Sequence, residues 1–412
     1  MVEGGDVQRT VVVIGGGASG MMAAGTAAER GRRVILLEKN RVLGRKIRIT
    51  GKGRCNLTNL TDVEGLVAHI PGNGRFLRSA FYRFGPEDLI RFFAGLGLET
   101  KVERGSRVFP VSDVSADVVR ALERFVRAGG VDVRLDTVAR AVVADGGVRG
   151  VRLKDGALLE ADAVVLAAGG ASYPATGTTG DGYRMAAALG HALVPIRPSL
   201  VPLEVAEAWA AELQGLSLRH VDLYALSPED RTLWRERGEM LFTHFGVSGP
   251  LALSASRHVV RCEGCRLRID LKPALTEERL DARVQRDLQA AARRQVANAL
   301  RDLLPHALIP VALREAAIPE QTPAHQITRA QRLRLVHALK HLMLTVTGPR
   351  PWSEAITTAG GVSVAEVDPR TMQSRRVPGL YLTGEVLDVD GYTGGYNLQI
   401  AFTTGRVAGE SV

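Results

Sequence analysis

The 412-residue sequence is poor in cysteine and contains only Cys55, Cys262 and Cys265. An odd and sparse set of cysteines argues against the disulfide frameworks of small secreted proteins. Cys262 and Cys265 form a single C-x-x-C motif, whereas a tetrahedral zinc site would need a second pair of ligands. Because the motif lies between apolar runs, we expect a hairpin turn there rather than a redox centre, and we expect no metal site.

Long hydrophobic runs are also absent. The N-terminal run VVVIGGG is too short to cross a bilayer, and no basic segment precedes it as in a signal peptide. Hydrophobic residues make up 45% of the chain and charged residues 24%, which is an ordinary globular composition. We therefore expect a cytoplasmic protein of two or three domains, with no membrane association and no obligate protein partner.

Acidic residues are fewer than basic ones, 44 against 53, which leaves a formal net charge of +9. This surplus fits a polyanionic partner such as RNA. Arginine-rich proteins of high-GC bacteria reach a similar surplus without such a partner, so charge alone leaves the choice open.

A dinucleotide-binding fingerprint begins the chain. Residues 11–14 predict a strand, residues 21–29 a helix of small side chains, and residues 34–37 a second strand that ends at Glu38. The predicted pyrophosphate loop between strand and helix comprises Gly15, Gly17, Ala18, Ser19 and Gly20. Its glycines permit a tight turn and close approach of a pyrophosphate to the helix N-terminus, and Glu38 would accept hydrogen bonds from the adenosine ribose.

Two later segments repeat the pattern of a strand that runs into glycines. The β-rich stretch 131–165 ends in such a strand, and residues 379–385 form another that ends in an acid; residues 391–397 then open a helix near Leu398. In these segments the expected cofactor contacts are Ala168, Gly169, Gly384, Glu385, Thr393, Gly394, Gly395, Asn397 and Leu398.

A second G-x-G-x-x-G motif is absent, so no separate Rossmann domain for a nicotinamide is present. A single fingerprint with a strand-glycine-acid element near the C-terminus is typical of FAD-binding chains. Glu385 would bond the ribitol and pyrophosphate side, and amides of the helix start would face the flavin pyrimidine edge, where negative charge grows on reduction. Tightly bound NAD is the alternative, and the second acid favours FAD.

The order of these segments predicts an α/β fold with a Rossmann-type FAD-binding domain in two parts, residues 1–190 and 348–412. The insertion between them, residues 191–347, is β-rich in 191–275 and has helical spacing in 276–342.

The segment GRKIRITGKGRCNLTN, residues 44–59, combines glycines, cations, a thiol and amides. Its glycines let the backbone approach the pyrophosphate, its cations offset the phosphate charge, and its asparagines can bond a flavin or pyrimidine edge. The expected cofactor contacts between the first acid and the end of this segment are Lys39, Arg45, Lys46, Gly53, Arg54, Cys55 and Asn56.

Four long motifs make the chain resemble the bacterial BaiN/RdsA-type flavoproteins, also called aminoacetone-oxidase-like. They are GRKIRITGKGRCNLTN, GGASYPATGTTGDGY, GEMLFTHFGVSGP, and TTAGGV followed by GEVLDVDGYTGGYNLQIAF. The resemblance implies a two-part FAD domain with a β-barrel-like and helical insertion. It also implies NAD(P)H-dependent reduction, since some members reduce a uridine of large-subunit ribosomal RNA to dihydrouridine and others are linked to steroid enones.

Reduction of uracil by hydride at C6 requires a proton at C5, and a thiol is a plausible acid near neutral pH. We expect Cys55 as the first candidate, with Tyr392, His244 and Tyr183 as the others. Cys55 could instead be a small buried filler and His244 a structural histidine. Asp181 could contact the ligand or cap the helix near it.

Reduction of a uridine in immature or unfolded ribosomal RNA is thus the leading hypothesis for function. The alternatives are an FAD enzyme acting on a small unsaturated carbonyl compound or an amine, and a non-catalytic flavin-containing RNA-binding protein. Basic residues of the insertion could bind RNA phosphates, or could be solvated and salt-bridged. They are Arg283, Arg286, Arg293, Arg294, Arg301, Arg329, Arg332, Arg334 and Lys340.

Overall fold

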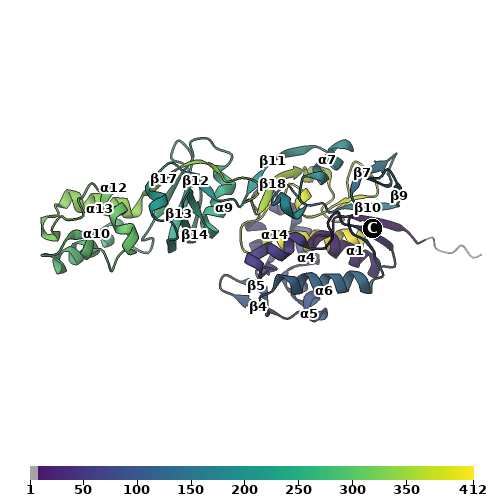
Figure 1. Cartoon of the computed structure of the whole chain (residues 1–412), viewed down its shortest axis with the longest axis horizontal. Helices are drawn as coiled ribbons and strands as arrows, with labels where there is room; N and C mark the ends of the chain where they lie inside the picture. The colour runs from purple at the N-terminus through teal and green to yellow at the C-terminus, as the bar shows by residue number, and fades with distance from the viewer. Residues whose placement is uncertain (1–7) are drawn as a thin grey trace, which may run out of the picture. The chain divides into compact units, whose positions relative to one another are not determined.

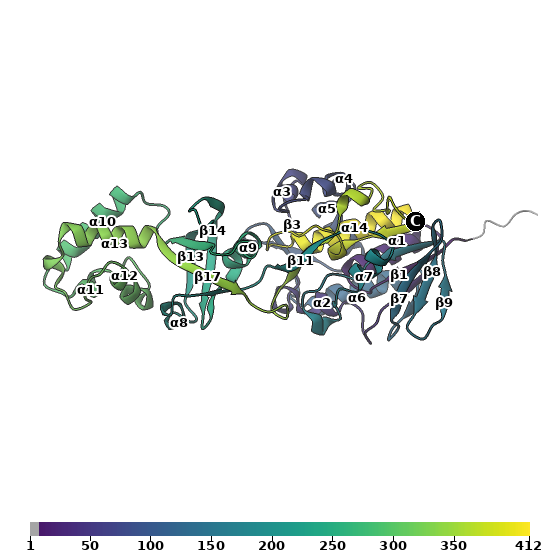
Figure 2. The same cartoon turned by 90° about the horizontal axis from the view of Figure 1, so that it is seen from above.

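The computed structural model describes residues 8–412, which divide into two compact units. The chain up to Pro198 and the segment Ala355–Val412 form the first unit, and Ser199–Glu354 form the second (Figures 1 and 2). The sequence predicted changes of unit at residues 190 and 347. Strand β11 (Leu193–Ser199) pairs with β18 (Thr357–Val362) in a two-stranded sheet. The first unit therefore continues past residue 190 to Pro198, and it resumes at Ala355 rather than at residue 348.

The first unit contains a five-stranded sheet in which each strand runs parallel to its neighbours. In spatial order its strands are β19 (Leu380–Leu382), β10 (Ala163–Leu166), β1 (Thr10–Ile14), β2 (Arg33–Leu37) and β6 (Asp132–Arg134). The predicted Rossmann-type α/β fold is confirmed, because strands from both ends of the chain share one sheet. Their carboxyl ends meet at one edge, where open α/β sheets bind ligands.

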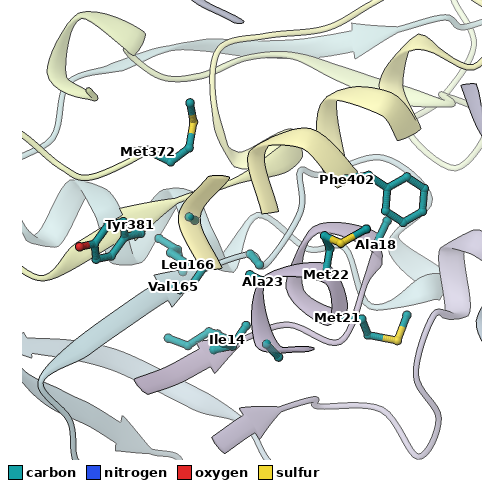
Figure 3. Close-up of a cluster of buried hydrophobic side chains, with 14 of the residues drawn as sticks. Ile14, Ala18, Met21, Met22, Ala23, Val165, Leu166, Met372, Tyr381 and Phe402 are labelled. Atoms are coloured by element: carbon teal, nitrogen blue, oxygen red, sulfur yellow. The ribbon is translucent and has the colours of Figure 1, made fainter. Parts of the chain in front are cut away.

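Helices cover this sheet and pack closely on one another. The helices of the unit are α1 (Ala18–Glu29), α2 (Arg45–Ile49), α3 (Val63–Ala68), α4 (Arg78–Arg83), α5 (Pro86–Gly95), α6 (Ser115–Ala128), α7 (Asp181–Ala188) and α14 (Tyr396–Ser411). Helix α1 packs on β1, β2 and β10 and is itself in contact with α6 and α14. Figure 3 shows apolar side chains of α1 and α14, among them Met22 and Phe402, in this fully buried core.

Small residues let α14 approach α1. A Cβ atom added at Gly405 would overlap the backbone of Ser19, and one at Gly409 would lie 2.6 Å from the Ala23 carbonyl oxygen. Side chains at these two positions are therefore excluded by the backbone of the fingerprint helix.

Two antiparallel three-stranded sheets complete the first unit. One contains β3 (Thr58–Asn59), β5 (Arg107–Pro110) and β4 (Thr100–Glu103), and the other contains β7 (Ala139–Ala144), β8 (Val148–Leu153) and β9 (Leu158–Glu160).

The second unit contains a closed six-stranded barrel, as the family resemblance implied. Around the barrel the strands are β12 (Leu203–Val205), β15 (Gly246–Ser248), β14 (Thr232–Thr243), β13 (Ser217–Leu226), β16 (Arg266–Asp270) and β17 (Leu342–Pro349). The helices of the unit are α8 (Trp209–Glu212), α9 (Gly249–Val259), α10 (Glu277–Ala290), α11 (Val296–Ala299), α12 (Ile309–Glu315) and α13 (Arg329–Lys340).

Two elements of the second unit differ from the sequence prediction. Helix α9 lies inside the stretch predicted as β-rich, and its second residue, Pro250, suits a first helical turn because that turn needs no N–H from it. Strand β17 follows the helices and closes the barrel between β16 and β12, so the insertion returns to β structure before it ends.

The C-x-x-C motif lies in a turn, but the turn joins helix α9 to strand β16, so the predicted hairpin is wrong, and Cys262 and Cys265 are joined by a disulfide bond. The absence of a cysteine framework elsewhere did not exclude a local crosslink within one turn. Among residues 8–412, no helix is both long and apolar enough to cross a membrane.

The packing of α14 on α1 predicts that Gly405→Ala lowers the free energy of unfolding by about 1–3 kcal/mol through overpacking. Gly95→Ala is the control, because Gly95 is also a helical residue, the last of α5, and a Cβ there would meet no atom within 4 Å. The control should be neutral or stabilising by up to about 1 kcal/mol. Urea unfolding measures both, and equal stabilities for the two variants would contradict the packing described.

Candidate active site

A cavity of about 210 Å³ lies at the carboxyl ends of β1, β2 and β10. Thirteen residues predicted from sequence line it: Gly15, Gly17, Ala18, Ser19, Glu38, Lys39, Arg45, Lys46, Ala168, Gly169, Glu385, Asn397 and Leu398. The walls also include residues that sequence reasoning missed, among them Asn40, Thr50, Val138, Gly177 and Ile356. All of these residues belong to the first unit.

The three fingerprint glycines have different physical roles. Gly15 has φ +109°, and a Cβ atom there would lie 2.5 Å from the Ala167 carbonyl oxygen; one at Gly20 would overlap the Gly15 carbonyl. At Gly15 and Gly20, backbone atoms of the protein therefore leave no room for a side chain. Gly17 is the N-cap of α1, and a Cβ there would meet nothing within 4 Å. The space beside Gly17 is open to a ligand, and four helical N–H groups follow it.

Glu38 is 8% exposed at the end of β2, and both of its carboxylate oxygens are oriented by hydrogen bonds. The Gly16 amide donates to Oε2 at 2.8 Å, and the backbone and side-chain nitrogens of Asn40 donate to Oε1 at 2.8 and 2.7 Å. Each oxygen keeps acceptor capacity for a ribose hydroxyl.

Lys39 is held by α7 across the cavity. Its Nζ donates to Asp181 Oδ2 at 2.6 Å and to Thr179 Oγ1 at 2.9 Å. Asp181 is the first residue of α7 and Gly180 is the N-cap, so Asp181 does not cap the helix. Burial opposes ionisation of Asp181, but the bonds from Lys39 and Thr179 outweigh it and lower the pKa of this carboxyl.

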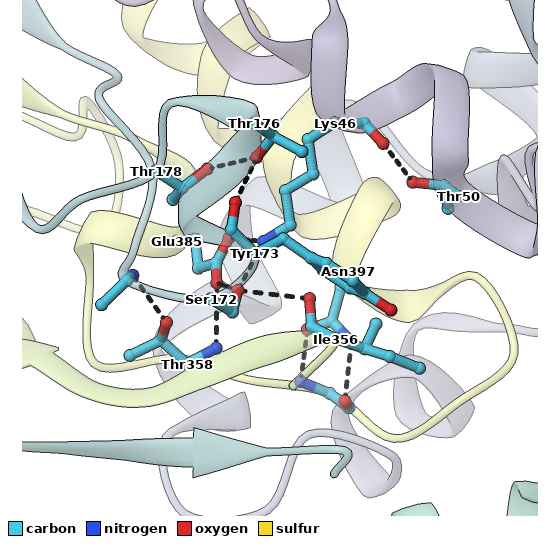
Figure 4. A network of polar contacts seen from close by, with 12 residues as sticks. Lys46, Thr50, Ser172, Tyr173, Thr176, Thr178, Ile356, Thr358, Glu385 and Asn397 are labelled. Atoms are coloured by element: carbon cyan, nitrogen blue, oxygen red, sulfur yellow. Dashed lines mark hydrogen bonds and ion pairs between the residues drawn. The ribbon is translucent and has the colours of Figure 1, made fainter. Parts of the chain in front are cut away.

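Lys46 and Glu385 join the two parts of the first unit (Figure 4). Lys46 Nζ donates to Glu385 Oε2 at 2.8 Å and to Ser172 Oγ at 2.7 Å. The Ser172 hydroxyl and the Thr358 amide both donate to Glu385 Oε1 at 2.9 Å. Donors from three other segments of the chain thus converge on one carboxylate.

Glu385 is ionised despite its enclosure. Burial acts to raise the pKa of its carboxyl, but the charge of Lys46 and the hydrogen bonds to both oxygens lower it by more. The cavity wall therefore has a negative charge at Glu385, held by its ion pair with Lys46.

Arg54 does not face the cavity, contrary to the sequence prediction. Its guanidinium forms ion pairs with Glu103 and Asp113 and lies 4.2 Å from the centre of the Phe109 ring. These partners lie about fifty residues away in the chain, which is why the local motif did not reveal them.

Cys55 also fails the expectation of a thiol at an open reactive face. It is fully buried within the apolar core, and it is not among the residues that line the cavity. Desolvation raises the pKa of its thiol to about 12, which makes it a weak acid at neutral pH. The alternative of a small buried side chain describes Cys55 better.

The glycines before α14 shape its N-terminus rather than the cavity wall. Gly395 is the N-cap with φ +102°, and a Cβ there would lie 2.5 Å from the Thr58 carbonyl. Asn59 Nδ2 donates to the Gly394 carbonyl oxygen at 3.3 Å. Of the predicted contacts, Gly20, Gly53, Asn56, Gly384, Thr393, Gly394 and Gly395 are likewise not part of the cavity lining among residues 8–412.

Asn56 retains an unused acceptor. Its Oδ1 atom is enclosed and has no hydrogen-bond partner within residues 8–412. A buried acceptor without a donor is costly, so this atom marks a position where a ligand donor would be stabilising.

The remaining candidate acids lie in different surroundings. Tyr392 is half-buried in the loop before α14, beside Asn397, whose Nδ2 donates to the Tyr392 carbonyl oxygen at 3.5 Å. Tyr183 is buried, donates to the Glu385 carbonyl oxygen at 3.0 Å, and has its pKa raised by burial. His244 is exposed in the β14–β15 turn of the second unit.

One group of side chains has the composition of a metal site, although the sequence predicted none. Ligand atoms of Glu277, His337 and His341 lie within 4.8 Å of one another. Arg268 contacts His341 Nδ1 at 3.4 Å, and His341 Nε2 contacts Glu277 Oε1 at 3.0 Å. Because arginine only donates, the proton of a neutral His341 is on Nε2, where a metal would bind. The group is therefore satisfied by hydrogen bonds.

The chain matches a known protein family over most of its length. Residues 9–411 match the family described as the HI0933-like protein Rossmann domain. The chain is 36% identical over 406 residues to the 3-dehydro-bile acid delta(4,6)-reductase of Clostridium scindens, covering 97% of this chain and 98% of that protein. It is 32% identical over 398 residues to the ribosomal RNA dihydrouridine synthase of Escherichia coli, covering 95% of each.

A solved structure shows the same fold at low identity. The 3-ketosteroid delta1-dehydrogenase from Sterolibacterium denitrificans matches with a TM-score of 0.52 and 13% identity, over 98% of this chain and 99% of that one. This chain belongs to the HI0933-like Rossmann-domain family, and it is an FAD-dependent oxidoreductase.

Proposed function

We propose that the enzyme uses NAD(P)H to reduce the C5=C6 bond of a uridine in large-subunit ribosomal RNA. The observation that carries the proposal is that two hydrogen-bonded carboxylates, Glu38 and Glu385, line one cavity together with the fingerprint loop. Two such acceptors suit a dinucleotide with hydroxyls in both halves, which FAD has in its ribose and ribitol.

The residues present fit FAD in three respects. The space beside Gly17 is open where a pyrophosphate would approach α1, and Arg45 and Lys46 are on the same cavity wall to offset its charge. The third is Asn56, which lies outside the cavity lining but has a buried acceptor without a donor that a flavin N–H would satisfy. When bound, FAD supplies the hydride that NAD(P)H provides for reduction of the substrate double bond.

Two facts favour a ribosomal RNA substrate. The chain is 32% identical to a ribosomal RNA dihydrouridine synthase over nearly its whole length, and its net charge of +9 favours association with a polyanion. A target base within a folded helix would have to leave the stack, so immature or unfolded RNA is the better substrate.

Tyr392 is the residue we assign as proton donor to C5 of the uracil ring. Its loop adjoins the cavity through Asn397, whereas Cys55 is enclosed in the core with a raised pKa. Tyr183 is held by the Glu385 carbonyl, and His244 belongs to the other unit. Tyr392 is thus the candidate acid beside the cavity that is neither fully buried nor part of the insertion.

Reduction of a small unsaturated carbonyl compound is the second candidate, because the chain is 36% identical to a bile acid reductase over 97% of its length. The chemistry is shared, since both substrates have a double bond conjugated to a carbonyl group. Neither candidate needs a different arrangement of the cavity residues.

Two parallel reactions distinguish the two candidate substrates. The holoenzyme with NADH or NADPH would be given protein-free ribosomal RNA in one reaction and a steroid enone in another. We expect a mass increase of about 2 Da at a uridine, from addition of two hydrogens, and slower turnover of the enone. Reduction of the enone with unmodified RNA would contradict the proposal and establish the second candidate.

Gly17→Ala tests the dinucleotide assignment. The substitution should leave the free energy of unfolding of the apoprotein nearly unchanged, because the added Cβ meets no protein atom within 4 Å. It should reduce FAD retention by at least tenfold, which corresponds to about 1.4 kcal/mol, because the methyl group occupies the space of the pyrophosphate. Equilibrium dialysis with Gly95→Ala as control measures this, and unchanged FAD affinity would argue against the assignment.

Tyr392→Phe and Cys55→Ala together test the proton donor. Tyr392→Phe should lower the single-turnover rate of uridine reduction by about 10²- to 10⁴-fold while flavin reduction by NAD(P)H stays intact. Cys55→Ala should keep the rate within a few-fold and cost about 1 kcal/mol of stability, as a buried truncation does. The reverse pattern of rates would return the acid role to Cys55.

A further inference from the structure

The outer side of the barrel presents a row of arginines on three adjacent strands. In the β13–β14 pairing Tyr224 is opposite Arg235, and in the β13–β16 pairing Tyr224 is opposite Arg268. Because side chains alternate along a strand, Arg237 and Arg266 lie on the same side. The alternate residues Leu223, Ala225, Leu267 and Ile269 are fully buried inside the barrel. We name the outward set Tyr224, Arg235, Arg237, Arg266, Arg268 and Lys272 the arginine face.

The guanidinium groups of the arginine face are held in place. The Arg268 and Arg235 guanidinium carbons lie 4.0 and 4.9 Å from the centre of the Tyr224 ring. Asp222, whose side chain is 2% exposed, pairs with Arg235 at 2.5 Å and with Arg237 at 2.7 Å. The side chains of both arginines nevertheless remain about half exposed, 53% and 52%. Fixed guanidinium forks of this kind lose little entropy when they bind a phosphate.

Positive charge exceeds negative charge on this face. Within residues 8–412, the carboxylates paired with its cations are Asp222 and Asp230, the latter with Arg266 at 2.5 Å. Lys272 follows β16, and its ammonium group has no hydrogen-bond or ion-pair partner in the described part of the chain. Partial burial and the nearby charge of Arg283 lower the pKa of Lys272. A bound anion would relieve that repulsion.

The helical surface predicted from sequence contains both paired and unpaired cations. Arg283, Arg332 and Lys340 are committed to Asp287, Asp281 and Asp270, and Arg334 donates to the Ala316 carbonyl. The basic residues that remain unpaired there, within residues 8–412, are Arg286, Arg293, Arg294, Arg301 and Arg329.

We propose that the arginine face of the barrel is the docking surface for the phosphate backbone of a single-stranded RNA segment. This inference rests on the proposed function, because it names where that enzyme holds its RNA. Cross-strand spacing places the guanidinium groups along the sheet as a row, which suits successive phosphates. The contacts are to the backbone and are therefore independent of base sequence.

The test uses an Arg266→Gln/Lys272→Gln variant of the FAD-loaded protein. Neither substitution leaves a buried carboxylate unpaired, since Asp230 is exposed and the Lys272 ammonium group has no partner within residues 8–412. Arg235 and Arg237 are unsuitable, because their removal would leave Asp222 without full compensation. The matched control is Arg30→Gln/Arg127→Gln, which removes two exposed cations from the first unit.

Binding of a uridine-containing single-stranded RNA oligonucleotide is measured against salt concentration. Each lost phosphate contact should reduce the slope of log affinity against log salt by about 0.7, so the variant should lose about 1.4 and the control nothing. FAD content and flavin reduction by NAD(P)H should be unchanged in both. An unchanged slope in the variant, or an equal change in the control, would overturn the proposal.

Two further measurements distinguish the arginine face from docking on the helices and from a general polyanion surface. Loss of slope only in Arg293→Gln/Arg294→Gln would place docking on the helices and overturn the arginine face. Polyglutamate that competes as strongly as RNA of equal charge would show a general polyanion surface and overturn the assignment to RNA. If the unmodified enzyme reduces no uridine in RNA, the proposed function itself fails. If it does and the variant matches it, only the arginine face fails.

Discussion

The ion pair between Lys46 and Glu385 joins two parts of the chain that are 339 residues apart, across the whole insertion. Ser172 and Thr358 bond the same carboxylate, so strands β10 and β18 and the segment after β19 are all tied to the helix that contains Lys46. The first unit depends on this convergence, because its sheet draws strands from both ends of the chain. The cavity lies where these segments meet.

The fingerprint and the second acid could be predicted from sequence because their geometry is local. A strand, a glycine turn and a helix in fixed order place Gly15, Gly17 and Glu38 regardless of the rest of the chain. Arg54 could not be placed in this way, since its partner Asp113 comes from a segment far along the chain. Cys55 shows the same limit, because burial by distant apolar residues decides the acidity of a thiol.

In the insertion, the periodicity of apolar residues predicts only part of the secondary structure. The split into β-rich and helical parts follows from alternating and helical spacing, whereas strand β17 depends on closure of the barrel by a segment that follows the helices. Charge patterns have a similar weakness. Arginines of the insertion with helical spacing look equivalent in sequence, yet Arg332 is committed to Asp281 and Arg293 is unpaired within residues 8–412. Only tertiary structure separates structural cations from those available to a ligand.

The central claim is that one cavity holds FAD between Glu38 and Glu385. The most direct measurement is chromatography and mass spectrometry of the cofactor released by denaturing the purified or FAD-reconstituted protein. The account predicts intact FAD, non-covalently bound, at about one molecule per chain. Release of FMN or NAD, or failure of the protein to retain FAD after reconstitution, would contradict it.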